Sequence, residues 1–276
     1  MGKPRHGRLT ARKRFGQHFL EPAWVDRLIE VVAPRPTDAF LEIGAGRGAL
    51  TLPLAARAGS VTAVEIDRDL AQQLETRLPP NARLLNRDFL ALDPDELGGR
   101  LPGTLRYRAA GNLPYNVAAP ILFRLLGLAR AGHGFTDATL MLQREVAERL
   151  VAYPGTKHYG VLAILTRVDA DAAIVLNLPP GAFRPVPKVR SSVVHLSFRG
   201  PRPTGPDRAL FDRLVRDVFT RRRKTILNAL KPVADRLGGS AVDALAGAGI
   251  DPSRRPETLE LTEFAALAEF LASTRK

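Results

Sequence analysis

The chain contains no cysteine in its 276 residues. This absence excludes disulfide bonds, thiolate metal ligands and cysteine nucleophiles, although it does not mark a compartment. Long apolar runs are also missing, since no stretch approaches the ~18 uninterrupted apolar residues that a membrane span needs. Hydrophobic residues still make up 45% of the chain, enough for a sizeable core. We therefore expect a soluble protein that has no membrane partner. Our separate expectations are that it is cytoplasmic and that it needs no metal.

Acidic residues are scarce relative to basic ones. Asp and Glu number 28 against 41 Lys and Arg, which gives a formal net charge of +13. Such an excess favours a polyanionic partner, and RNA is the obvious class. A GC-rich coding bias is the alternative, because nearly all the basic residues are Arg. Clustering of the basic residues distinguishes these two explanations better than their total does. Residues 1–14 are rich in basic residues and precede the first acid, Glu21. We interpret them as a basic arm whose expected phosphate contacts are Arg12, Lys13 and Arg14.

Strand-like apolar runs alternate with helical spacing through most of the chain. This alternation is typical of a doubly wound, mostly parallel sheet. Two late strands with no clear helix between them suit an antiparallel pair at the end of the sheet. The expected strands are residues 39–43, 61–65, 83–85, the run that ends at Asn112, 138–142, 172–176 and 192–198; the expected helices are 23–34, 50–58, 70–78, 118–128 and 145–150.

The segment 200–206 is rich in proline and glycine and has the composition of a linker. Beyond it the apolar spacing is helical throughout, with breaks at 238–239 and 250–252. We therefore predict a basic arm at 1–14, an α/β domain at 15–200 and a small helical, RNA-binding domain at 201–276.

A glycine-rich loop, Glu42 to Gly48, follows the first strand of the expected sheet. Glycines let a backbone approach a ligand closely, and the helix that follows presents free N–H groups. Glu65 ends the next strand, ~20 residues after the glycines, which is the spacing at which an acid binds ribose hydroxyls. Asp88-Phe89 follows the third strand. Either a dinucleotide or S-adenosylmethionine would fit a site of this kind. The loop here has the pattern Gly-x-Gly-x-Gly, whereas dinucleotide-binding loops have Gly-x-Gly-x-x-Gly, and this difference argues against a dinucleotide.

The tetrapeptide Asn112-Leu113-Pro114-Tyr115 ends the fourth strand. A carboxamide, a proline-stiffened turn and an aromatic ring can hold and stack a flat base that carries an amino group. Alone, the tetrapeptide could be an ordinary turn. Its place beside the glycine loop favours a catalytic role, and without a thiolate to attack a pyrimidine carbon the expected target is a nitrogen.

Together these motifs resemble those of the ribosomal RNA adenine N6-methyltransferases, to which residues 15–20 also correspond. Residues 183–194, 221–228 and 249–252 extend the resemblance to 9–272, nearest to the KsgA-type enzymes of the small subunit. It implies a Rossmann-like S-adenosylmethionine-dependent methyltransferase fold, with a mostly parallel seven-stranded sheet and a C-terminal helical domain. The implied reaction is N6,N6-dimethylation of two adjacent adenosines near the 3′ end of 16S ribosomal RNA in an assembling small subunit, by a monomer.

The resemblance also implies roles for individual residues. Asn112 and the Leu113 carbonyl would accept hydrogen bonds from the adenine amine, Pro114 would stiffen the turn, and Tyr115 would stack on the base. Phe183 is the candidate for the second stacking face, and an ordinary aromatic residue of the core is the alternative. Two departures stand out: His18 replaces the family's usual Asn, and residues 117–120 replace an Ile-Ser-Thr-Pro type of run. S-adenosylmethionine would contact Gln17, His18, Leu20, Gly44, Gly46, Glu65, Ile66, Asp88, Phe89 and Asn112.

A second basic cluster, residues 221–224, interrupts an apolar stripe that runs from Leu210 to Leu230. On a continuous helix Arg222 would fall near the middle of that stripe. Either the helix breaks near Thr220 and the cluster opens a second helix that binds phosphate, or Arg222 extends out of the core. We favour the break. The RNA contacts expected outside the arm are Lys188, Arg221, Arg222, Arg223 and Lys224.

Other functions stay open on the sequence alone. An enzyme of this fold could methylate the large ribosomal subunit, as macrolide-resistance enzymes do, or DNA. A non-catalytic RNA-binding assembly factor is a rival of another class, although the intact glycines, acids and Asn-Leu-Pro-Tyr turn argue against lost catalysis. A dehydrogenase is the most distant alternative.

Overall fold

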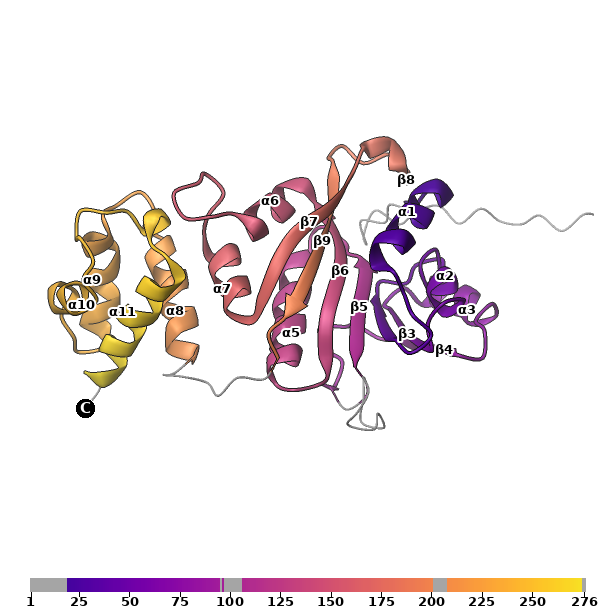
Figure 1. The fold of residues 1–276 in the computed structure, drawn as a ribbon, viewed down its shortest axis with the longest axis horizontal. Coiled ribbons are helices and arrows are strands. Elements are labelled where there is room, and N and C mark those ends of the chain that lie inside the picture. The colour runs from indigo at the N-terminus through magenta and orange to yellow at the C-terminus, as the bar shows by residue number, and fades with distance from the viewer. Residues whose placement is uncertain (1–18, 95, 97–105, 201–207, 275–276) are drawn as a thin grey trace, which may run out of the picture. The chain divides into compact units, whose positions relative to one another are not determined.

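The computed structural model describes residues 19–94, 96, 106–200 and 208–274 (Figure 1). Contacts divide the chain into two compact units. The sheet unit comprises 1–125, 134–144 and 174–195, and the helical unit comprises 126–133, 145–173 and 196–276. Segments that precede residue 200 therefore group with the C-terminal helices. The three-part division at residues 14 and 200 stays a prediction, and the arm lies outside the described residues.

Seven strands form one sheet in the order β4-β3-β2-β5-β6-β9-β7 (Figure 1). The pairs β2–β3, β3–β4, β2–β5 and β5–β6 are all parallel, as predicted. Strands β9 and β7 are neighbours at one end, where the late pair was expected. The strands are β2 (Ala39–Ile43), β3 (Ser60–Glu65), β4 (Ala82–Asn86), β5 (Tyr107–Asn112), β6 (Phe135–Gln143), β7 (Ala170–Leu178) and β9 (Ser191–Phe198).

The chain changes direction across the sheet between β2 and β5. From β2 it runs outward through β3 and β4, and it then returns to the other side of β2 as β5. In an open α/β sheet this switch point, at the carboxyl ends of the strands, is where ligands bind. All five residues of β2 are buried, which is expected of a central parallel strand covered on both faces.

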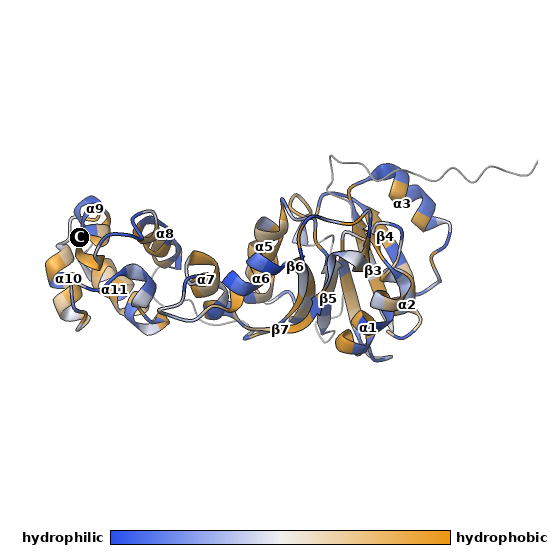
Figure 2. Cartoon of the chain, turned by 90° about the horizontal axis from the view of Figure 1, so that it is seen from above, coloured by the Kyte–Doolittle hydropathy of each residue, from blue (hydrophilic) through white to orange (hydrophobic). Residues whose placement is uncertain are grey.

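Helices of the sheet unit carry apolar residues on one side (Figure 2). Helix α1 (Pro22–Val32) buries Val25, Leu28, Ile29 and Val32, the spacing predicted for it. Asp67 caps α3 (Arg68–Glu75) by accepting hydrogen bonds from Asp69 N and Leu70 N. The remaining helices before residue 200 are α2 (Thr51–Ala55), α5 (Ala118–Arg130), α6 (Arg144–Val151) and α7 (Val161–Asp169).

Two elements were not predicted. One is helix α7, and the other is a two-stranded antiparallel sheet of β1 (Phe19–Leu20) and β8 (Phe183–Arg184). Each of these strands has only two residues, too few to show any periodicity. The pairing joins the start of the described chain to the segment just before β9.

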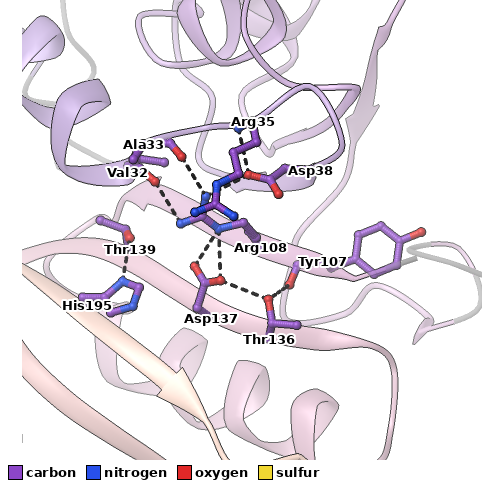
Figure 3. Close-up of polar contacts among 10 residues, drawn as sticks. All are labelled: Val32, Ala33, Arg35, Asp38, Tyr107, Arg108, Thr136, Asp137, Thr139 and His195. Atoms are coloured by element: carbon purple, nitrogen blue, oxygen red, sulfur yellow. Dashed lines mark hydrogen bonds and ion pairs between the residues drawn. The ribbon is translucent and has the colours of Figure 1, made fainter. Parts of the chain in front are cut away.

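An arginine ties the amino end of β5 to its surroundings (Figure 3). The Arg108 guanidinium forms ion pairs with Asp38 at 2.9 Å and Asp137 at 3.0 Å. It also donates to the carbonyls of Val32 at 2.8 Å and Ala33 at 3.3 Å, at the end of α1. These contacts satisfy carbonyls that the helix leaves unpaired. The network lies at the end of the strand opposite to Asn112.

The C-terminal helices are α8 (Arg208–Phe219), α9 (Ile226–Arg236), α10 (Ala241–Gly247) and α11 (Leu261–Ser273), with a 3-10 turn η3 (Pro256–Thr258). Helix α8 ends at Phe219, so the predicted break near Thr220 is confirmed. The basic residues 221–224 form the turn itself, and α9 begins only after them, with Thr225 as its cap. The prediction that they open the second helix was therefore wrong, because a residue with a short hydroxyl side chain caps α9 instead.

Candidate cofactor and base-binding site

A cavity of about 350 Å³ lies at the carboxyl ends of β2, β3, β4 and β5. This volume is within the ~300–1,000 Å³ typical of small-molecule sites. The glycine loop, the Glu65-Ile66 pair, the Asp88-Phe89 pair and the turn at 112–115 all line it. The structure therefore brings together most of the residues that the sequence predicted for the cofactor and the base.

The glycine loop has the backbone conformation that its sequence predicts. Gly44, Gly46 and Gly48 have φ angles of 79°, 56° and 80°, in the left-handed region that favours glycine. The amides of Gly44 and Ala45 both donate to the Val64 carbonyl, at 2.9 and 3.1 Å, so the loop folds over the end of β3. A turn over 46–50 separates the loop from α2, which begins at Thr51 rather than at residue 50.

Glu65 fastens this loop and faces the cavity. Its Oε2 accepts a hydrogen bond from Gly46 N at 2.7 Å, and its Oε1 accepts one from Asp67 N at 2.8 Å. Burial raises the pKa of Glu65, and the nearby Asp67 carboxylate adds to that effect. Each carboxylate oxygen can accept a second hydrogen bond, so the residue can still receive ribose hydroxyls.

Glu42 is a site residue that the sequence analysis included in the glycine motif without giving it a role. Its side chain is 1% exposed and lines the cavity. Among the described residues, Glu42 Oε2 and the buried Thr51 Oγ1 have no hydrogen-bond partner. Burial raises the pKa of Glu42 to about 8; the Thr51 hydroxyl opposes this shift, and repulsion by Glu65 adds to it. A buried acid with one oxygen left unpaired at a cavity wall can ionise opposite a cationic group of a ligand, because the nearby opposite charge would lower its pKa again.

The other wall of the cavity is mainly apolar. Ile66 is 50% exposed although it is a large aliphatic residue, and Phe89 is buried against the wall. Asp88 is exposed and accepts a hydrogen bond from Leu90 N at 2.9 Å. Leu20, on β1, also lines the cavity. An apolar slot with a carboxylate at its mouth can hold a purine ring.

The turn after β5 lies close against β2. A Cβ atom at Gly111 would meet the Ile43 carbonyl oxygen at 2.5 Å, and one at Gly44 would meet the Asn112 carbonyl oxygen at 3.6 Å. Leu113 is buried and donates its amide to the Met141 carbonyl at 3.2 Å. These contacts fix the backbone that carries the Asn112 side chain, which lines the cavity.

Tyr115 is held by a residue that the sequence did not indicate. Its hydroxyl lies 2.8 Å from Ser191 Oγ, at the start of β9. Ser191 is 1% exposed, whereas Tyr115 is half-buried at the cavity. Burial raises the pKa of Tyr115, so the phenol stays neutral at physiological pH. The signal that could have located Ser191 is its position three residues after the Phe-Arg-Pro-Val-Pro-Lys segment, inside the 183–194 motif.

Three groups of predicted residues lie elsewhere. Phe183 is 0% exposed, belongs to the hydrophobic core and is not among the residues that line the cavity. Its ring therefore presents no face to a base in this structure, and we no longer assign it the second stacking face. Lys188 is exposed on the segment between β8 and β9. Gln17 and His18, and the expected phosphate contacts Arg12, Lys13 and Arg14, lie outside the described residues.

The basic turn contains two kinds of arginine. Arg221, Arg223 and Lys224 are exposed. Arg222 instead pairs with Glu257 at 2.7 Å and donates to the Lys157 carbonyl at 2.7 Å. Its guanidinium is therefore already engaged within the helical unit.

Within residues 19–94, 96, 106–200 and 208–274, no three His, Cys, Asp or Glu side chains are grouped so that they could hold a metal ion. No helix in this part of the chain has the length and apolarity to cross a bilayer.

Comparison with known proteins gives full-length matches. The profile of the family described as Ribosomal RNA adenine dimethylase matches residues 8–273. The chain is similar to the Ribosomal RNA small subunit methyltransferase A of Anaeromyxobacter sp. (strain K), with 43% identity over 270 residues that cover 95% of this chain and 94% of that protein. The protein of the same name from Xylella fastidiosa (strain 9a5c) is 40% identical over 262 residues, which cover 94% and 95%.

Solved structures support the fold. A dimethyladenosine transferase from Plasmodium falciparum, 24% identical, matches with a TM-score of 0.78 over 93% of this chain and 98% of that one. The 23S rRNA methyltransferase ErmE, 27% identical, matches with a TM-score of 0.64 over 92% and 99%. The predicted fold class is confirmed. The chain belongs to the ribosomal RNA adenine dimethylase family.

Proposed function

We propose that the protein transfers methyl groups from S-adenosylmethionine to the N6 atoms of two adjacent adenosines near the 3′ end of 16S ribosomal RNA, during assembly of the small subunit. The observation that carries the proposal is a cavity at the switch point that two groups of residues line. One wall of this cavity combines the carboxylates of Glu65 and Asp88 with apolar side chains, which suits a nucleoside. The Asn112–Tyr115 turn forms another part of the lining and suits a base. The curated relatives, named as small-subunit methyltransferases, support the choice of substrate.

The residues of the cavity fit the proposed methyl donor. Glu65 would accept hydrogen bonds from its ribose hydroxyls, and Ile66 and Phe89 would contact the faces of its adenine. Asp88 would accept from the adenine amine, and Glu42 offers an unpaired buried oxygen to a cationic group. When bound, S-adenosylmethionine supplies a methyl group on a positively charged sulfur, which is an electrophile.

The turn at 112–115 would position the nucleophile, which is the N6 amine of the target adenine. An adenine N6 amine is a poor nucleophile because its lone pair is delocalised into the ring. Hydrogen bonds from the amine to Asn112 Oδ1 and the Leu113 carbonyl would hold the nitrogen so that its lone pair points at the methyl carbon. Positioning of this kind can supply a large part of a rate enhancement. Tyr115 would stack on the base, a contact typically worth ~1–3 kcal/mol.

The chemistry of the turn also suits two successive transfers. A carboxamide oxygen and a backbone carbonyl are neutral acceptors, so they can bind the amine before and after the first methylation. The amine becomes acidic only once the new N–C bond forms, and its proton can then leave to water. No dedicated general base is assigned for this reason.

The test is methyl transfer to purified ribosomal subunits. Small and large subunits that lack the modification are incubated separately with the protein and labelled S-adenosylmethionine, and their RNA is analysed by mass spectrometry. We expect two dimethyladenosines in small-subunit RNA only. Label in the large subunit would favour the alternative large-subunit activity, and label in neither, with intact RNA binding, would favour a non-catalytic assembly factor.

Asn112→Ala should abolish transfer while cofactor binding is partly retained, because the acceptor for the base is lost but only one of several expected cofactor contacts. Gln73→Ala, which removes a carboxamide from an exposed position of α3, is the matched control and should transfer at the wild-type rate. Near-full turnover by Asn112→Ala would contradict the mechanism.

A further inference from the structure

Within the helical unit, the connection between α6 and α7 is fastened to the turn between α8 and α9. Arg222 joins them: its Nη2 donates to the Lys157 carbonyl at 2.7 Å, and its Nε pairs with Glu257 at 2.7 Å. Gly155 N then donates to the Glu257 carbonyl at 2.7 Å. Three segments that are distant in the sequence, 153–158, 220–224 and η3, are therefore held together (Figure 1).

Tyr153 stands on this assembly with its ring in solvent. It is 69% exposed, more than any other large hydrophobic residue of the described chain. Its carbonyl accepts hydrogen bonds from the amide and the hydroxyl of Thr156, at 3.1 and 2.6 Å, which closes a tight turn. The Arg167 guanidinium lies over the ring, 4.1 Å from its centre, and also donates to the Val151 carbonyl. One face of the tyrosine is thus supported by a cation, and the high exposure leaves the rest of the ring accessible.

The charge around Tyr153 is positive. Lys157, Arg221, Arg223 and Lys224 are exposed on the segments that Arg222 joins. Of the acids there, Glu257 is paired with Arg222, and Glu148 lies 4.0 Å from His158. An exposed aromatic ring among cations is the arrangement by which proteins bind unpaired nucleotides, since the ring stacks on a base and the cations contact phosphates.

We propose that Tyr153 is a stacking platform for an unpaired base of the ribosomal RNA, with Lys157, Arg221, Arg223 and Lys224 on the flanking phosphates. Arg222 is a positioning residue that holds the two halves of this surface together. The inference rests on the proposed function, because it places a second contact on the same RNA. A protein partner is disfavoured by the density of like charge, and an acidic protein is kept as an outcome of the test.

The experiment measures the affinity of the full-length protein for small subunits at several salt concentrations. Tyr153→Ala should weaken binding by about fivefold to a hundredfold, the range expected when one stacked base is lost. Tyr153→Phe should bind within about twofold of the wild type, since it keeps the ring. Val242→Ala, which truncates a 62% exposed side chain on α10, is the matched control and should change nothing.

The salt dependence separates stacking from charge. Tyr153→Ala should lower affinity equally at all salt concentrations, whereas Arg223→Ala should reduce the slope of log affinity against log salt by about 0.7–0.9. In methyl transfer, Tyr153→Ala should raise KM for subunits and leave kcat near wild type. A loss of affinity in Tyr153→Phe equal to that in Tyr153→Ala would overturn the stacking role.

Two further outcomes are decisive. A photocrosslinking amino acid at position 153 should capture ribosomal RNA, and capture of a ribosomal protein instead would overturn the proposal in favour of a protein contact. If the wild-type protein binds and methylates small subunits while Tyr153→Ala behaves identically, this inference fails and the proposed function stands. If the wild type neither binds nor methylates them, the proposed function fails first.

Discussion

Replacing Gly111 by alanine tests whether the packing of β5 against β2 sets the position of the turn at 112–115, to which we assign the catalytic role. Gly111 directly precedes Asn112, and a Cβ atom there would meet the Ile43 carbonyl oxygen at 2.5 Å. The backbone of Gly111 is outside the left-handed region, so alanine is not excluded by its own φ angle. The perturbation is therefore purely steric, and the atom it meets is backbone, which cannot rotate away.

The magnitude follows from the distance. Ordinary contact begins at 3.4 Å, so one of the two strands must move by about 0.9 Å. Forcing an extra methyl group into a packed interior typically costs ~1–3 kcal/mol of stability. A misplacement of ~1 Å at a reacting centre can reduce turnover by about a hundredfold. We therefore expect Gly111→Ala to remain folded at low temperature and to lose about two orders of magnitude in kcat.

The assay combines urea unfolding with methyl transfer to small subunits, and Gly59→Ala is the control. A Cβ atom at Gly59 would meet the Pro36 carbonyl oxygen, also at 2.5 Å, but Gly59 precedes β3, at the end opposite to the cavity. Both variants should be destabilised, and only Gly111→Ala should lose turnover. Wild-type kcat in Gly111→Ala, or an equal loss in Gly59→Ala, would refute the reasoning.

Three other predictions concern single contacts. Tyr115→Phe and Ser191→Ala should lower kcat/KM by similar factors, and the double variant should lose no more than either, because both remove the same 2.8 Å hydrogen bond. Since the pKa of Glu42 is raised to about 8 from 4.5, the stability that its bound proton provides is fully present below pH ~4.5 and is lost as pH rises through ~8. Glu42→Gln should flatten that loss in urea unfolding between pH 5 and 9. Arg222→Ala should change the salt slope of subunit binding less than Arg223→Ala does, because Glu257 already neutralises Arg222.

The parallel strands could be predicted because burial on both faces leaves a continuous apolar run. β2 was expected at residues 39–43 and is found there. Helix α7 escaped prediction for the same reason. It buries four successive residues, from Ala163 to Thr166, so the middle of the helix reads as a continuous apolar run.

The cavity was predictable to the extent that strand ends meet at one edge of a parallel sheet. The register pairs Ile43 with Val64 and Glu65 with Asn86. The glycine loop after β2 therefore lies beside the carboxylates of Glu65 and Asp88. The polar details could not be read in this way. Ser191 meets Tyr115 across 76 positions of the chain, a contact that only the completed sheet creates.

Phe183 shows why a motif does not define exposure. The segment it belongs to was expected near the base, and Ser191, eight residues later, does contact Tyr115. The Phe183 side chain is nevertheless buried, because β8 pairs with β1 and the ring packs with the apolar side of α1. Two-residue strands leave no periodic signal, so the pairing could not be predicted, and the core position of Phe183 stayed only an alternative to stacking.

The basic turn makes the same point about charge. Four consecutive cations were given one role from the sequence, but the fold separates them. Arg222 can reach Glu257 and the Lys157 carbonyl because α8 ends at Phe219 and α9 starts at Ile226, so the turn between them faces η3 and the α6–α7 connection. A count of basic residues therefore overestimates the charge available to RNA. It also misses the role we propose for Arg222, which is to hold the segment that carries Tyr153 beside the turn that carries the remaining cations.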